Sequence, residues 1–441
     1  MITSRFRHRG QRLTAAGALC TLLVLLLLSS VPSAGAQGVP IRQATEGTVV
    51  GSGLVNPRFV AIADDGTLYV SEAGSGGTEE VPGTPIRRGM TGQVMRLGPG
   101  GAKTVVAASL PSYGATGPAG LVTAGGTLWL AIGGPIPGPE PLPLAPLPME
   151  NTVMRVISPT TAGQQGMQQV ADIGAFEQAN NPDAGVLGSN VFDLARAADG
   201  MLYVADSGGN VLFRVHPTTG QVSLVTVFAR LPARQPGPGG QNEIEPVPTG
   251  VAVGPDGAVY VGLYGGGPPV TGRSKVVRVS PAGVVSEVVT GLSNIIDVEV
   301  GPDRHLYVVE LSAGIDLSAQ PPVVQPGRVL RVLPNGSTQV VVDGLEFPGG
   351  MTFDRQGTLF ITTNTVTPPG PPPAPGTAPR GQVLRFDRIV APAVALPRTG
   401  SAESGTTGGA PVAGLLPAGV GLLALVGTGT VAILTSRRRS A

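Results

Sequence analysis

The sequence predicts an all-β fold, a six-bladed β-propeller with four antiparallel strands per blade, and three observations support this. A short segment built around an Asp-Gly type turn recurs six times along the chain, and internal repetition of this kind is typical of propellers. Each copy is followed by a strand that carries one arginine among apolar residues. Glycine and proline account for 67 and 44 of the 441 residues, which favours short strands joined by many turns.

The recurring segment predicts a tight hairpin of two strands, a and b. Apolar residues precede each turn, and an apolar-aromatic-apolar triplet such as Leu68-Tyr69-Val70 follows it. The six copies lie at residues 65–70, 126–130, 199–204, 256–261, 304–308 and 357–361. Strand c carries the arginine, which is Arg96, Arg155, Arg214, Arg278, Arg331 or Arg385. Because it recurs at one place, we interpret this arginine as structural and expect it to pair with neighbouring blades or backbone carbonyls.

A fourth strand, d, follows in five of the six repeats. These strands lie around residues 104–106, 169–171, 224–226, 287–289 and 340–342. The sixth repeat lacks one, but residues 48–54 at the start of the chain have the same character. We expect this segment to complete the sixth blade and close the ring, because closure protects an exposed sheet edge. The predicted propeller spans residues 45–390. A two-sheet sandwich, the main alternative, does not explain why the missing strand stands at the opposite end.

The first 36 residues resemble a secretory signal peptide. Four arginines precede an apolar run from Leu19 to Leu28, and the small residues Ala34-Gly35-Ala36 follow. We expect cleavage between Ala36 and Gln37, with residues 37–44 as a linker. An uncleaved membrane anchor is the alternative, although the run is shorter than the roughly 20 residues that span a bilayer.

The C-terminal region resembles the LPxTG cell-wall sorting signal of sortase substrates. The motif is Leu396-Pro397-Arg398-Thr399-Gly400, within a linker of residues 391–411, and it precedes an apolar segment (412–435) and a basic tail (436–441). The resemblance implies that a sortase-type transpeptidase cuts after Thr399 and links the chain to the cell envelope. The spacer is longer than usual in that family, so a retained membrane-spanning tail stays open as the alternative. Both alternatives predict a secreted, extracellular domain anchored by its C-terminus.

Composition excludes several function classes. Seven of the 29 basic residues lie at the two ends of the chain, which leaves a mildly acidic domain and argues against nucleic acid as a partner. Cys20, the single cysteine, lies in the signal segment, so disulfides and thiolate catalysis are not expected. His216 and His305 fall in c-to-d and a-to-b turns, opposite the long loops, which disfavours a histidine base in the channel.

The central repeats resemble NHL-type blades. The residues that carry this resemblance are Tyr203-Val204-Ala205-Asp206-Ser207-Gly208-Gly209-Asn210, residues 248–257, and Asn294-Ile295-Ile296-Asp297. Together they are similar to the ScyD/ScyE family, secreted propellers named for the cyanobacterial scytonemin gene cluster. The resemblance covers residues 45–390 and implies the propeller fold, but it implies no reaction.

Acidic and amide side chains recur at the ends of strands that line the predicted channel. The candidate ligands of a Ca²⁺ ion are Glu72, Asn190, Asp193, Asn294, Asp297 and Glu310. A calcium-centred lactonase or esterase of the gluconolactonase propeller type would use such a set to polarise an ester carbonyl. The alternative is that these carboxylates bind backbone N–H groups at strand ends, which we favour.

The connections from strand b to strand c are long in five repeats and predict a decorated face. They span residues 72–93, 133–151, 265–274, 311–328 and 363–382, and several are rich in proline. They are either solvated spacers or a contact surface for a glycan or a protein. We therefore expect a surface-tethered propeller that acts as a binding or scaffold module, with the Ca²⁺-dependent hydrolase as the alternative.

Overall fold

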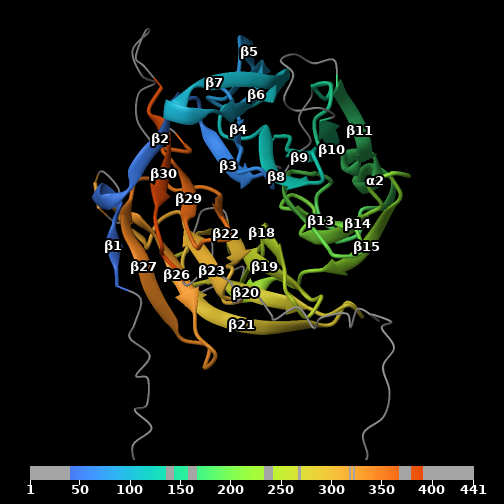
Figure 1. Ribbon diagram of the computed structural model, residues 1–441. Helices are drawn as coiled ribbons and strands as arrows, with labels where there is room; N and C mark the ends of the chain where they lie inside the picture. Colours follow the sequence, from blue (N-terminus) through green and yellow to red (C-terminus); the bar gives the residue numbers. More distant parts are fainter. Residues whose placement is uncertain are drawn as a thin grey trace, which may run out of the picture. The chain divides into compact units, whose positions relative to one another are not determined.

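The computed structural model describes residues 40–135, 144–156, 166–232, 242–266, 270–316, 319–320, 323–366 and 379–390. In these ranges, six sheets of four or five strands stand around a central axis (Figure 1), which confirms the all-β, six-bladed propeller. The signal segment, its cleavage site, the LPRTG motif, the apolar segment 412–435 and the basic tail lie outside the described residues. Among the residues described, no helix is long and apolar enough to cross a membrane.

Blades one to three follow each other along the chain, with the innermost strand first in each. Blade one contains β3 (Pro57–Ile62), β4 (Leu68–Glu72), β6 (Arg87–Leu97) and β7 (Lys103–Ser112), and β5 (Glu79–Glu80) pairs with β6. Blade two contains β8 (Pro118–Ala124), β9 (Thr127–Ile132), β10 (Thr152–Val156) and β11 (Met167–Asp172). Blade three contains β12 (Val191–Arg196), β13 (Leu202–Asp206), β14 (Val211–Val215) and β15 (Val222–Val227).

Blades four to six continue in the same order. Blade four contains β18 (Pro248–Val253), β19 (Val259–Leu263), β20 (Ser274–Val279) and β21 (Val285–Leu292). Blade five contains β22 (Ile295–Val300), β23 (Leu306–Glu310), β26 (Gly327–Val332) and β27 (Thr338–Leu345). Blade six contains β28 (Met351–Phe353), β29 (Leu359–Thr363) and β30 (Gly381–Phe386). The inner strands contact one another in chain order, and β28 contacts β3.

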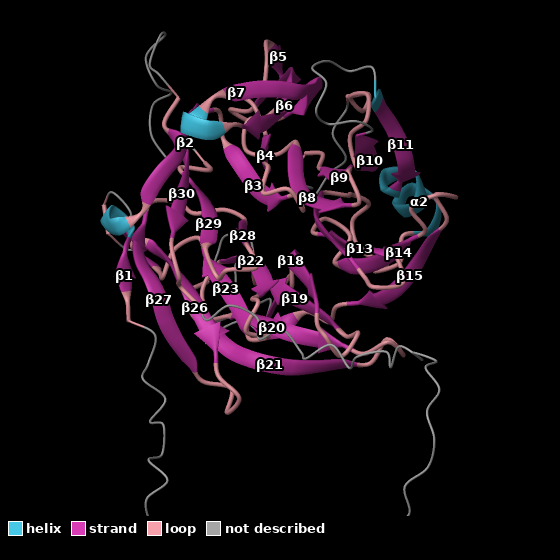
Figure 2. Ribbon diagram, viewed as in Figure 1, coloured by secondary structure: helices cyan, strands magenta, loops and turns pink. Residues whose placement is uncertain are grey.

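Small elements decorate the ring (Figure 2). Two ribbons, β16 (Leu231–Pro232) with β17 (Glu243–Ile244) and β24 (Ile315–Asp316) with β25 (Val323–Val324), lie in connections between the larger strands. The short helical turns are η1 (Ala44–Glu46) and η2 (Pro99–Gly101). Asp172 caps the N-terminus of helix α2 (Ile173–Asn180): its side chain accepts a hydrogen bond from the Ala175 N–H and so satisfies one free donor of the first turn.

The N-terminal segment lies beside the last two blades (Figure 1). The strand β2 (Thr48–Leu54) pairs antiparallel with β30, with Thr48 opposite Arg385 and Leu54 opposite Gly381. The strand β1 (Arg42–Gln43) pairs parallel with β27. The predicted linker of residues 37–44 therefore includes two residues that add an edge strand to blade five.

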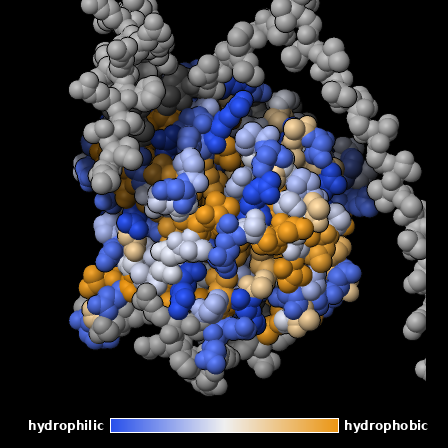
Figure 3. Space-filling model, turned by 90° about the horizontal axis from the view of Figure 1, so that it is seen from below, coloured by the Kyte–Doolittle hydropathy of each residue, from blue (hydrophilic) through white to orange (hydrophobic). Residues whose placement is uncertain are grey.

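The hydrophobic core lies between the blades. Six clusters of buried apolar side chains each join neighbouring sheets. In one of them, Leu54 of β2 packs with Val383 of β30 and with Val60 and Val70 of blade one. Some apolar side chains at the outer edge of the blades face solvent, such as Val284 and Val285 near the start of β21. Figure 3, seen from below, shows apolar patches interspersed with polar side chains.

Three of the repeated arginines of strand c pair with an acid of their own blade, whereas the prediction was that they pair with neighbouring blades or backbone carbonyls. Arg214 donates to Asp199 at 2.8 Å, Arg278 to Asp256 at 2.7 Å and Arg331 to Asp303 at 2.9 Å. Each acid belongs to the a-to-b turn. The reason is the local register. Arg214 stands opposite Tyr203 on strand b, and Asp199 lies in the turn that directly precedes this strand.

Candidate functional site: two cavities along the channel

Two cavities open along the axis that the inner strands surround. The turn-face cavity has a volume of about 1150 Å³ and is lined by a-to-b and c-to-d turns, such as residues 197–199 and 280–283. The loop-face cavity has a volume of about 600 Å³ and is lined by b-to-c and d-to-a connections, such as Gly208 and Val247. The second volume lies within the ~300–1,000 Å³ that is usual for small-molecule sites.

One layer of residues in the channel wall alternates between glycine and larger side chains. At one equivalent position of the inner strands, blades two, four and six carry Gly120, Gly250 and Gly350, and blades one, three and five carry Phe59, Asp193 and Asp297. A Cβ on Gly250 would lie 2.5 Å from the Asp297 Cα, and a Cβ on Gly120 would lie 2.6 Å from the Asp193 Cα. These glycines therefore allow the next blade around the ring to approach closely.

The two aspartates of this wall bind the backbone of the next blade. Asp193 Oδ2 accepts a hydrogen bond from the Val251 N–H at 2.8 Å, and Asp297 Oδ2 accepts one from the Met351 N–H at 2.7 Å. Both carboxyls line the turn-face cavity, although their side chains are almost fully buried. They therefore join blade three to blade four and blade five to blade six.

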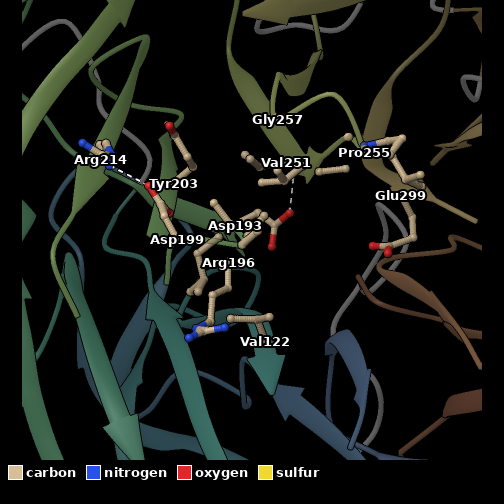
Figure 4. A pocket seen from close by; sticks show the side chains of 18 of the residues that line it. Val122, Asp193, Arg196, Asp199, Tyr203, Arg214, Val251, Pro255, Gly257 and Glu299 are labelled. Carbon is tan, nitrogen blue, oxygen red and sulfur yellow. Dashed lines mark hydrogen bonds and ion pairs between the residues drawn. The ribbon is translucent and has the colours of Figure 1, made fainter. Parts of the chain in front are cut away.

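A third carboxyl, Glu299, lies in the same cavity (Figure 4). Burial raises the pKa of Glu299 to about 8. Burial also raises the pKa values of Asp193 and Asp297 well above their ordinary values, and the charge of Asp193 raises that of Asp297 further. At neutral pH Glu299 therefore retains its proton, since burial penalises the charged form.

The acids at the ends of strand b bind loop backbone and side chains. Asp206 accepts hydrogen bonds from the N–H groups of Asn190 at 2.7 Å and Gly208 at 3.0 Å. Glu310 accepts one from the Ser293 N–H at 2.7 Å and pairs with Arg328. Glu72 accepts a hydrogen bond from Gln93. Strand-end capping is thus the role that their geometry shows.

The six candidate calcium ligands do not come together as one group. Asp193 and Asp297 line the turn-face cavity, and Asn190 lines the loop-face cavity. The buried Asn294 donates from Nδ2 to the Ser312 carbonyl at 3.3 Å. In the ranges that the structure describes, no group of three or more His, Cys, Asp or Glu side chains is arranged to hold a metal ion. This set therefore does not fit a single Ca²⁺ ion, which needs six to eight converging oxygens.

The loop-face cavity contains a buried arginine that sequence reasoning missed. Arg58 of β3 is 7% exposed, and its guanidinium lies 5.3 Å from the ring centroid of Phe192. Burial lowers the pKa of Arg58 to about 10 and raises the pKa of the nearby Tyr264 to about 12. Within the described part of the chain, the Arg58 side chain has no hydrogen bond or carboxylate partner.

The signal for Arg58 was present in the repeats. Equivalent places in the other inner strands carry Ala119, Phe192, Thr249, Ile296 and Gly349. The arginine is therefore the one charged residue at a place otherwise filled by uncharged side chains. Aligning strands a, rather than their triplets alone, would also have revealed the glycine alternation and Glu299.

Comparison with known proteins finds distant structural similarity. No family model matches the chain, and no curated protein matches it either. A calcium-binding regucalcin from Agrobacterium tumefaciens is 11% identical, with a TM-score of 0.47, over 78% of this chain and 94% of that one. A putative gluconolactonase is 12% identical, with a TM-score of 0.46, over 77% and 91%. A virginiamycin B lyase from Staphylococcus aureus is 12% identical, with a TM-score of 0.42, over 76% and 96%. Each of these three structures is thus only distantly similar to this chain, with a TM-score below 0.5.

Proposed function

We propose that this chain is an exported binding propeller whose small-molecule ligand, or the end of a larger glycan or protein ligand, enters the loop-face cavity. The observation that carries the proposal is the cavity itself: about 600 Å³ at the axis, with apolar walls and a few convergent polar groups. Sites of this composition are typical of ligand binding.

The polar groups that already have hydrogen-bond partners, and those that do not, favour the loop-face cavity over the turn-face cavity as the binding site. In the turn-face cavity, Asp193 and Asp297 already accept backbone N–H groups, and the third carboxyl, Glu299, is uncharged at neutral pH because burial raises its pKa to about 8. At the loop face, the polar lining includes Arg58 and Tyr264, whose side chains make no hydrogen bond within the described residues. Groups of this kind remain available to a ligand.

The location at the cell surface is part of the same proposal. It is supported by the signal-like segment 1–36 and by the LPRTG motif, the apolar segment and the arginine tail. Sortase and the cell envelope are the proposed partners of the C-terminus, with a membrane-spanning tail as the alternative. Mass spectrometry of the mature C-terminus tests this: a terminus at Thr399 supports wall linkage, and an intact Arg437–Arg439 tail contradicts it.

We also propose that β2 completes blade six and closes the ring. The pairing of β2 with β30 supports this, as does the burial of Leu54 between blades six and one. A ring joined in this way would hold the inner strands, and hence both cavities, in a fixed arrangement.

Blocking variants at the two mouths test the binding site. Ala115 is exposed and lines the loop-face cavity, and Ala282 is exposed and lines the turn-face cavity. Ala115→Trp should abolish binding of small-molecule fragments to the full chain in detergent, as followed by ligand-observed NMR. Ala282→Trp is the matched control and should leave that binding unchanged. Fragments that bind equally well to both variants would refute the assignment of the cavity.

A further inference from the structure

The buried arginine of the loop-face cavity points to the chemistry of the ligand. Resting on the function proposed above, we propose that the ligand is a small organic acid whose carboxylate pairs with Arg58, while its apolar body lies against the cavity wall.

Hydrogen bonds fix the backbone from which the Arg58 side chain extends. The Arg58 carbonyl accepts hydrogen bonds from the Gly350 N–H at 2.7 Å and from the Thr362 hydroxyl at 3.0 Å. The guanidinium contacts the Phe192 ring. This contact attracts the cation but provides no acceptor for its five N–H donors.

A second buried arginine, Arg88, has hydrogen-bond acceptors for its terminal nitrogens, although its Nε has none among the described residues. Arg88 is 5% exposed, comparable to Arg58. It donates to Glu79 Oε1 at 2.8 Å and to the Ala145 carbonyl at 2.7 Å. Because burying a charge without partners is costly, the absence of such partners for Arg58 among the described residues indicates that an external anion supplies them.

The remaining lining indicates a carboxylate with an apolar body. Phe192, Ile296 and Leu311 line the same cavity, and the Tyr264 hydroxyl offers a further donor. Guanidinium and carboxylate match in a planar, bidentate geometry.

The rim of the cavity disfavours anions of higher charge. Asp183 and Glu245 line it, and both accept hydrogen bonds from Asn210 Nδ2, at 3.1 Å and 3.0 Å. Arg230 pairs with Glu245. Since Asp183 has no basic partner among the described residues, it would repel a phosphate dianion more strongly than a single carboxylate.

Calorimetric titration of the full chain in detergent tests the proposal with three probes: phenylacetate, its neutral counterpart phenylacetamide, and inorganic phosphate. We expect phenylacetate to bind at least tenfold more tightly than phenylacetamide, and phosphate not to compete. Equal binding of the acid and the amide, no binding of the acid, or tighter binding of phosphate would each overturn the carboxylate assignment. If Ala115→Trp still abolished binding of the amide or of other fragments, the proposed cavity function would survive that failure.

Substitution of Arg58 separates binding from a merely structural role. Arg58→Met should remove the preference for the acid over the amide, and the unliganded variant should melt at or above the wild-type temperature because an unpaired buried charge is gone. Arg58→Lys keeps the charge without the planar fork and should weaken phenylacetate binding while retaining the preference. The matched control is Arg355→Met at an exposed ion pair, which should change neither property. The ligand-binding role of Arg58 would be refuted if Arg58→Met melted lower and bound phenylacetate as the wild type does. If Arg58→Met failed to fold, an unchanged phenylacetate affinity in Arg58→Lys would refute it.

Discussion

The protonation of Glu299 gives a quantitative test of the channel. Its pKa rises from an ordinary value of 4.5 to about 8 because burial penalises the charged form of this partly exposed side chain. The folded state therefore holds a proton that the unfolded state releases between these values, so this group lowers the stability as pH rises from about 4.5 to about 8. Replacing it by glutamine removes the penalty.

The expected gain follows from the size of the shift. With about 1.4 kcal/mol per pKa unit, Glu299→Gln should raise the free energy of unfolding by about 4 kcal/mol at pH 8 and by about 1 kcal/mol at pH 5. Asp193 and Asp297 contribute in the same direction, because the charge of Glu299 raises their pKa values as well.

Urea unfolding of the wild type and of Glu299→Gln at pH 5 and pH 8 measures this difference in the free energy of unfolding. Glu243→Gln, at an exposed position of β17, is the matched control and should behave as wild type at both pH values. The reasoning would be refuted if Glu299→Gln changed stability equally at the two pH values, or lowered it at pH 8.

Three further predictions concern the ring and the metal. Gly250→Ala should destabilise the fold by about 3 kcal/mol, because its Cβ would clash with the backbone of blade five. The control Gly98→Ala should be near neutral, because its nearest contact would be 3.6 Å away. Equal denaturation midpoints for the two variants would contradict this prediction. Leu54→Ala should cost about 2–5 kcal/mol and exposed Val49→Ala little, and a neutral Leu54→Ala would count against closure by β2. Millimolar Ca²⁺ should leave the melting temperature unchanged, and a concentration-dependent rise would restore the calcium hypothesis.

The sequence was sufficient for the fold because each blade repeats local chemistry. Asp65 accepts a hydrogen bond from the Thr67 N–H two residues on, and Asp199 does the same for Met201, so the turn is specified within a few residues. The pairing of Arg214 with Asp199 spans 15 residues within one blade. The prediction failed there because it considered neighbouring blades and backbone carbonyls as partners, but not the acids of the turn.

The site was harder to predict because its partners depend on how blades meet. Asp193 binds a backbone N–H 58 residues further along the chain, and Asp297 binds one 54 residues away. Nothing in the local sequence distinguishes such an aspartate from a calcium ligand. The lack of a carboxylate partner for Arg58 likewise depends on the other five inner strands, which carry uncharged residues at the equivalent places.

The alternation of glycine with a larger residue along the channel wall has a consequence for how such a ring can change in size. Its true unit is a pair of blades, because each large side chain needs a glycine beside it. Duplication of a single blade would place two bulky residues, or two glycines, next to each other and leave a clash or a gap. Evolution or redesign of this architecture should therefore proceed more readily by adding or removing two blades at once.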